Sequence, residues 1–150
     1  MKATKKNLNG TERRGAVAVE AALGLVLLVT LLLGMLEFGR ALMVGQLVTN
    51  AAREGARLCV VDGTSNEDVK ARVNEFLKST LNISDETGLM IDITVEPAEG
   101  NTNPGNEVAN ANTGDLCQVV VSVPYEEVDF GVVRFLRNAA LVGSVSMRHE

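Results

Sequence analysis

The chain has 150 residues, 46% of them hydrophobic, and a net charge of −5 at neutral pH. Its basic residues are concentrated at the start: residues 1–15 carry five Lys and Arg against Glu12 alone, so residues 16–150 keep nine basic side chains against 18 acidic ones. This acidic balance argues against a nucleic-acid partner and against anchoring through anionic lipids.

An apolar run follows the basic start. Residues 16–36 would form a helix of about 32 Å, long enough to cross one hydrocarbon core. The positive-inside rule then places residues 1–15 in the cytoplasm as a basic leader, and everything after residue 36 outside. A cleaved secretory signal fits less well, because Glu37 and Arg40 stand where a small-residue cleavage site is expected.

A single carboxylate, Glu20, interrupts the apolar run near its beginning. Charged groups are expensive inside a bilayer unless something pairs with them, so Glu20 is a functional residue by default. Gly15 ends the basic leader, and Glu20 is the fifth residue counted from Ala16. We therefore expect a positively charged group to meet Glu20 within the membrane.

This junction resembles the start of a type IV prepilin. Over residues 13–57 the chain resembles the TadE-like family, the pseudopilins of tight-adherence pilus systems. The shared elements are the RG-x(4)-E start, LEFGR at 36–40 and TNAAREGAR at 49–57. The ending SVSMRHE at 144–150 is also similar, though more weakly.

The resemblance implies that a prepilin peptidase cuts between Gly15 and Ala16, and that Glu20 neutralises the freed amine of a neighbouring subunit. It implies a single-pass protein of the inner (cytoplasmic) membrane with its C-terminal part extracytoplasmic, and incorporation into a pilus stays open. The implied partners are other pilus or pseudopilin subunits, the peptidase, an inner-membrane assembly platform and the lipid bilayer. Ala16 stands where major pilins carry Phe, so N-methylation of the new terminus stays open.

Helical spacing continues beyond the membrane run and predicts a helix from about 16 to 58, of which 37–58 is an extracytoplasmic continuation. The residues that keep this spacing are Ala41, Val44, Val48, Ala52 and Gly55. Glycine lowers helix propensity, so its frequency here has two open interpretations: close packing of neighbouring subunits, or the ordinary composition of membrane helices. The glycines concerned are Gly24, Gly34, Gly39, Gly45 and Gly55.

Glu37 and Arg40 share a helix face at the outer membrane boundary. Three interpretations are open: an ion pair within the helix, a contact of Glu37 with a basic residue of another subunit, or a solvated charge at the boundary. The solvated charge is the favoured one.

Residues 59–150 have the composition of a small extracytoplasmic domain whose core needs reinforcement. Cys59 and Cys117 lie on the expected oxidising side, which favours a disulfide closing a loop of roughly 60 residues, worth about 4 kcal/mol in the chain-entropy model. Cys117 shares the apolar face of its strand with Val119, which is where a helix end would dock. Two free buried thiols are the alternative. A metal site is not expected, because only His149 is available beside the two thiols.

The same domain shows one helix pattern and several strand patterns. A capping box at Ser65 and Asp68 predicts an amphipathic helix at 66–81. Alternation predicts strands at 89–96 and 116–123 and a third near the C-terminus, while 130–138 stays open between a short helix and an extended connection. The expected fold is α+β and pilin-like: a long N-terminal helix, a small helix and an antiparallel sheet.

Residues 100–115 are rich in Gly and Asn without periodicity, which predicts a mobile surface loop and a candidate contact surface. Their Asn and Asp oxygens are calcium ligands in kind, but the spacing is not that of an EF-hand.

No catalytic motif is present in the sequence, and neither a metal nor a cofactor is expected. The favoured function is therefore a TadE-like pseudopilin, a non-catalytic component of pilus assembly processed after Gly15. The alternative is an uncleaved, membrane-anchored module that recruits envelope proteins, and a membrane-tethered enzyme is the least favoured class. The favoured function is compatible with two roles, a subunit of the filament or an assembly factor that stays in the membrane.

Overall fold

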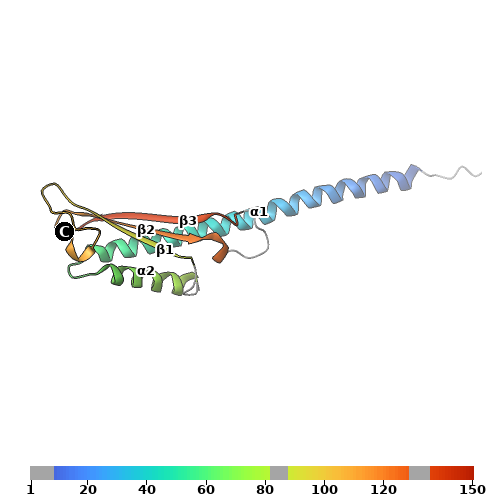
Figure 1. The fold of residues 1–150 in the computed structure, drawn as a ribbon. Coiled ribbons are helices and arrows are strands. Elements are labelled where there is room, and N and C mark those ends of the chain that lie inside the picture. Colours follow the sequence, from blue (N-terminus) through green and yellow to red (C-terminus); the bar gives the residue numbers. More distant parts are fainter. Residues whose placement is uncertain (1–8, 82–87, 129–135) are drawn as a thin grey trace, which may run out of the picture. The chain divides into compact units, whose positions relative to one another are not determined.

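The structure is a computed structural model that describes residues 9–81, 88–128 and 136–150. Within these residues the elements are α1 Asn9–Cys59, α2 Asn66–Leu81, β1 Met90–Glu96, η1 Val108–Asn110, β2 Leu116–Pro124, η2 Tyr125–Glu127 and β3 Ala140–Arg148 (Figure 1). The fold is α+β, as expected from the sequence. The element predicted at 130–138 falls largely outside the described residues. The chain divides into two compact units, Met1–Leu36 and Glu37–Glu150.

The first unit is the N-terminal part of α1. The helix begins at Asn9, earlier than the predicted start at residue 16. Every side chain from Arg14 to Leu32 is exposed, and Leu27 reaches 73%. Among the described residues, α1 is the helix long and apolar enough to cross a membrane, which is consistent with a single-pass anchor. An apolar surface of this extent needs lipid or other apolar helices around it.

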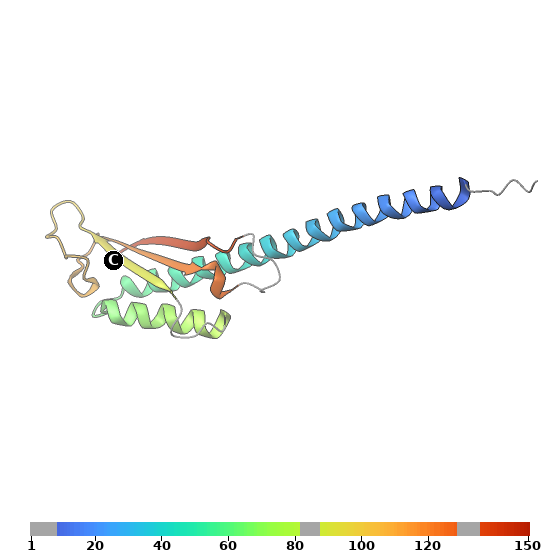
Figure 2. The ribbon, with the colours of Figure 1, turned by 45° about the vertical axis from the view of Figure 1, so that its right-hand side comes forward.

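The second unit is built on a three-stranded sheet in the order β1-β2-β3, antiparallel on both sides of β2. Val119 of β2 is paired with Ile93 of β1 and Val145 of β3, so apolar residues line up across one face. Figures 1 and 2 show α2 and the C-terminal part of α1 alongside this sheet. The predicted strands are confirmed to within one residue at each end, and the predicted C-terminal strand is present.

The second half of α1 contributes its apolar stripe to the core of this unit. Side chains on this stripe are buried against the sheet and α2, so the continuation of the helix is an integral part of the sheet domain. The buried residues of α1 are Ala41, Val44, Val48, Ala51, Ala52, Ala56 and Cys59.

Close packing within the chain explains why a glycine stands at position 55. A Cβ added there would lie 2.7 Å from Cγ2 of Val73 in α2 and 3.3 Å from Cγ1 of Val119 in β2. The three elements therefore meet at a point that tolerates no side chain. Gly24, Gly34, Gly39 and Gly45 have open space around them, so both interpretations of their role remain.

Gly143 is the point where β3 rests on the backbone of α1. A Cβ on Gly143 would lie 2.7 Å from both Cα and N of Thr49, atoms that cannot move without shifting the helix. We expect Gly143→Ala to lower the free energy of unfolding by about 1–3 kcal/mol, as overpacking does. Gly45→Ala, at a helical position with nothing within 4 Å, is expected to raise it by about 0.5–1 kcal/mol. Urea unfolding of the full chain in detergent, followed by circular dichroism, measures both; equal effects of the two changes would contradict the close approach.

α2 begins with the predicted capping box. The Ser65 backbone N–H and hydroxyl both donate to Oδ2 of Asp68, at 3.0 and 2.7 Å, and the Asp68 N–H donates to the Ser65 hydroxyl at 3.3 Å. These bonds lower the pKa of Asp68. Further along, Arg72 forms an ion pair with Glu54 of α1 at 3.0 Å, which links the exposed sides of the two helices.

The segment predicted to be a mobile loop is held in place by the buried carboxylate of Asp115. Oδ1 accepts the Ala98 N–H at 2.8 Å and the Asn101 side-chain amide at 2.6 Å, while Oδ2 accepts the Asn112 N–H at 2.8 Å. Asn106 extends the network by accepting the Val95 N–H of β1 at 3.1 Å. The Asn and Asp oxygens therefore bind backbone and side-chain donors inside the loop, an organisation that the sequence did not predict.

The hydrogen bonds from Asn101, Ala98 and Asn112 lower the pKa of Asp115. A carboxyl whose pKa is lower in the folded state stabilises the fold above its unfolded pKa of about 3.9 and loses that contribution as pH falls through the folded pKa. We expect Asp115→Asn to lower the thermal midpoint by several degrees at pH 7 and to weaken the loss of stability in acid. Thermal unfolding at pH 7 and below pH 4 measures this, with Asp92→Asn, which changes an exposed carboxyl of β1, as the matched control for general carboxyl effects. An unchanged acid dependence in Asp115→Asn would contradict it.

Candidate functional site

Gly15, Ala16 and Glu20 lie in succession on the exposed N-terminal part of α1. The backbone is helical throughout this stretch, and a Cβ on Gly15 would meet nothing within 4 Å. The Glu20 side chain is exposed, and no hydrogen bond or ion pair joins it to any residue in the described ranges. A carboxylate placed this way among apolar neighbours needs a cation from outside the chain or from its own processed terminus.

Glu37, in contrast, is buried, with 6% of its surface exposed. Its Oε1 accepts the N–H of Leu136 at 3.1 Å, and its backbone carbonyl accepts the hydroxyl of Tyr125 at 3.1 Å. Arg40 donates from Nε to the carbonyl of Val128 at 2.9 Å. The interpretation of Glu37 as a solvated boundary charge is therefore wrong, because Glu37 is buried where Tyr125, Val128 and Leu136 contact this part of α1.

LEFGR thus anchors the sheet domain to its own helix. Oε2 of Glu37 is buried and has no hydrogen-bond partner among the described residues. A contact between this carboxylate and another subunit would require it to be uncovered. Tyr125, which the sequence did not single out, is the chain's only tyrosine and is fully buried; that rarity was the one available signal.

Cys59 and Cys117 meet in the core of the second unit. Both are free thiols in the structure and both are buried. The neighbouring Cys117 thiol, through a side-chain hydrogen bond, and burial raise the pKa of Cys59 far above its usual range. The structure therefore brings together the two residues that the sequence predicted to pair, without a bond between them.

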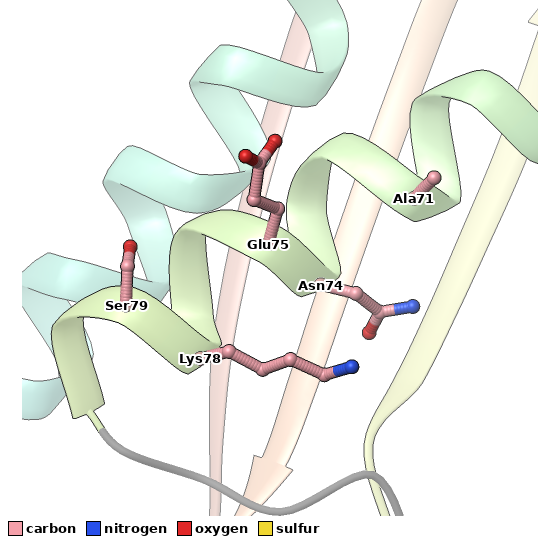
Figure 3. A pocket seen from close by; sticks show the side chains of 5 residues that line it. All are labelled: Ala71, Asn74, Glu75, Lys78 and Ser79. Atoms are coloured by element: carbon pink, nitrogen blue, oxygen red, sulfur yellow. The ribbon is translucent and has the colours of Figure 1, made fainter.

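A hollow on α2 has no catalytic arrangement (Figure 3). In Figure 3, Asn74 and Lys78 point to one side of the helix and Glu75 and Ser79 to the other, with Ala71 further along. Glu75 is paired with Arg72 at 3.1 Å on the exposed surface. Within the part of the chain that the structure describes, no group of three or more potential metal ligands occurs.

A second hollow is an apolar groove between α1 and the first residues of β3. Its lining carries no charge: Phe38, Ala41, Leu42, Gly45, Gln46, Thr49, Ala140, Leu141 and Val142. Phe38 is 54% exposed and Leu42 71%. Such a lining suits an apolar partner and makes the groove a better candidate contact surface than the Asn-rich loop.

His149 is also buried, at 5% exposure, beside the end of β3. Its N–H donates to the carbonyl of Asp115 at 2.8 Å, and its Nε2 lies 3.7 Å from Oδ1 of Asp62. These contacts hold the last strand against the loop.

Comparison with known protein families gives a match to the N-terminal part of the chain. The family described as TadE-like protein matches residues 15–57, which confirms the resemblance over most of α1. The matched segment contains Gly15, Glu20, Glu37 and Arg40 and stops just before Cys59. No curated protein and no solved structure matches the chain.

Proposed function

Since the TadE-like segment at residues 15–57 relates this chain to tight-adherence pilus proteins, we propose that it is a pseudopilin, a non-catalytic component of pilus assembly. In this proposal a prepilin peptidase cleaves after Gly15, and the membrane helix then assembles with other subunits. The sheet domain stands on the extracytoplasmic side. The protein resides in the inner membrane, with an assembly platform and other pilus subunits as partners.

The observation that carries the proposal is Glu20, an exposed carboxylate on an apolar helix that has no partner among residues 14–81, 88–128 and 136–150. A helix that served only as an anchor would gain by losing this carboxylate, because a charge in hydrocarbon is costly. A free amine at Ala16 of a neighbouring chain supplies the missing positive charge at the same depth. Cleavage after Gly15 is what creates that amine.

The second unit supports an assembly role by its contacts with α1. LEFGR is hydrogen-bonded to Tyr125 and Val128, which follow β2, and to Leu136, which precedes β3. The groove at Phe38 and Leu42 follows directly after the membrane segment in sequence and offers an apolar contact surface to another subunit.

An uncleaved, membrane-anchored recruiting module is the second candidate. It is favoured by the unbroken helix through Gly15 and by a sheet domain that has a core of its own. In that case residues 1–15 remain attached and Glu20 finds its partner in another membrane protein.

The N-terminal residue and intact mass of the protein from its host membranes separate the two candidates. We expect a chain that starts at Ala16 and expect Gly15→Leu to retain the leader and lose pilus assembly. Gly24→Leu is the matched control for leader cleavage, because Gly24 also has open space in the same helix but lies away from the cleavage site. A wild-type chain that keeps Met1 through Gly15 in assembled pili would overturn the proposal in favour of the uncleaved module.

A further inference from the structure

We propose that Cys59 and Cys117 form an intrachain disulfide that fastens the last residue of α1 to the central strand of the sheet. The inference rests on the extracytoplasmic placement of residues 37–150, which belongs to the proposed function. It goes beyond that function because it assigns a covalent modification that assembly through the membrane helix does not require.

The directions of α1, β2 and β3 determine which of their residues can meet. Gly143 of β3 lies against Thr49 of α1, and further along the same strand His149 lies near Asp62, just past the end of α1. β3 therefore runs in the same direction as α1. Because β2 is antiparallel to β3, β2 runs opposite to α1.

The spacing of residues along α1 and β2 determines whether the two cysteines meet. Gly55 of α1 packs against Val119 of β2. From Gly55, one helical turn of four residues leads to Cys59, a rise of about 6 Å. From Val119, two residues back along β2 lead to Cys117 on the same face, about 6.6 Å in the same direction. The helix step and the strand step match, so the two thiols meet, in agreement with the side-chain contact between them.

The surroundings of the two thiols determine when a bond between them can form. Both side chains are closed off in the core, where Cys117 is paired with Val95 on one side and Met147 on the other. The neighbouring Cys117 thiol and burial raise the pKa of Cys59, and the closed core keeps both sulfur atoms out of reach of soluble thiols. The bond therefore forms before the core closes, and once formed it is protected from reductants.

The chemistry balances with an oxidant of the extracytoplasmic space. A protein disulfide of a thiol oxidase accepts the thiolate of one cysteine as a mixed disulfide, and the second cysteine then displaces the oxidant's thiol. Two S–H bonds break and one S–S bond forms in this chain. The two protons and two electrons convert the oxidant's disulfide to two thiols.

The bond would close a loop that contains α2, β1 and the Asp115 network. Closing a loop of this length restricts the unfolded chain far more than the folded one. Both ends of the bond lie in the core, so it also keeps the helix end from separating from the sheet when force acts along α1. The expected gain is in resistance to unfolding rather than in the shape of the folded state.

The test uses full-length protein taken from host membranes, quenched in acid and alkylated under denaturing conditions. We expect neither cysteine to be alkylated without reduction, an intact mass lower by two hydrogen atoms, and a linked peptide containing both residues. Alkylation of both cysteines without reduction overturns the proposal. The same mass spectrum reports the N-terminal residue, so failure of the disulfide and failure of processing at Gly15 are read separately.

Variants distinguish a bond from two packed thiols. If the bond exists, Cys59→Ser, Cys117→Ser and the double variant lower the unfolding midpoint equally, because each removes the same link. Reductant added during unfolding should then lower the wild-type midpoint and leave all three variants unchanged. Additive losses in the variants, with a wild-type midpoint insensitive to reductant, would overturn the proposal.

Discussion

Glu20→Val is expected to abolish pilus assembly while leaving the protein inserted in the membrane. The variant removes a carboxylate that has no partner in the described part of the chain, so the isolated helix becomes more stable in lipid. What it loses is the pairing with a freed amine of a neighbouring subunit, and with it the register between helices. Counting pili by electron microscopy, together with membrane fractionation, separates the two effects.

Thr30→Val is the matched control for this experiment. Thr30 is the other polar side chain on the same stretch, and its hydroxyl already donates to the carbonyl of Val26 at 2.8 Å. The Thr30 hydroxyl already has a hydrogen-bond partner within the helix, so its removal should leave the number of pili unchanged. Normal piliation in Glu20→Val, or an equal loss in Thr30→Val, would sink the proposed pairing.

Tyr125→Ala is expected to lower the free energy of unfolding of the second unit by about 3–5 kcal/mol, as the truncation of a buried aromatic does. Tyr125 is fully buried, and its hydroxyl reaches the carbonyl of Glu37 on α1. Tyr125→Phe keeps the ring and removes the hydroxyl, so its expected cost is only about 0.5–1.5 kcal/mol. Chemical unfolding of the two variants in detergent gives both values.

The comparison of these two variants tests the anchoring role assigned to LEFGR. If Tyr125→Phe costs as much as Tyr125→Ala, the hydrogen bond to α1 and not the packing of the ring holds the domain together. If Tyr125→Ala costs less than about 1 kcal/mol, the ring is not a core residue and the described packing is wrong.

Local periodicity predicted the elements well. The stripe from Ala41 to Gly55 and the alternation around Val119 are repeated patterns, and each identifies a buried face without reference to the rest of the chain. The capping box at Ser65 and Asp68 is likewise contained within four residues. These parts of the fold were therefore available from the sequence.

The remaining parts depend on contacts between distant segments. Glu37 lies in a stretch that looks like a membrane boundary, and its burial follows only from the return of Tyr125 and Leu136, about a hundred residues later. Asp115 organises backbone donors in a loop without periodicity, which leaves no pattern to read. The glycine at 143 gives no hint in sequence that a helix backbone lies against it.

The contact between Gly143 and Thr49 also orders events in time. In the proposed topology the chain emerges from its membrane helix onward, so the apolar stripe of α1 is exported well before β3, the strand that completes the sheet. During that interval the stripe has no sheet to cover it and is open to the helices of neighbouring molecules. Two processes then compete while the domain matures: exported helices associate with one another, or β3 arrives and completes the sheet. Slower export of residues 140–148 would favour the association of helices.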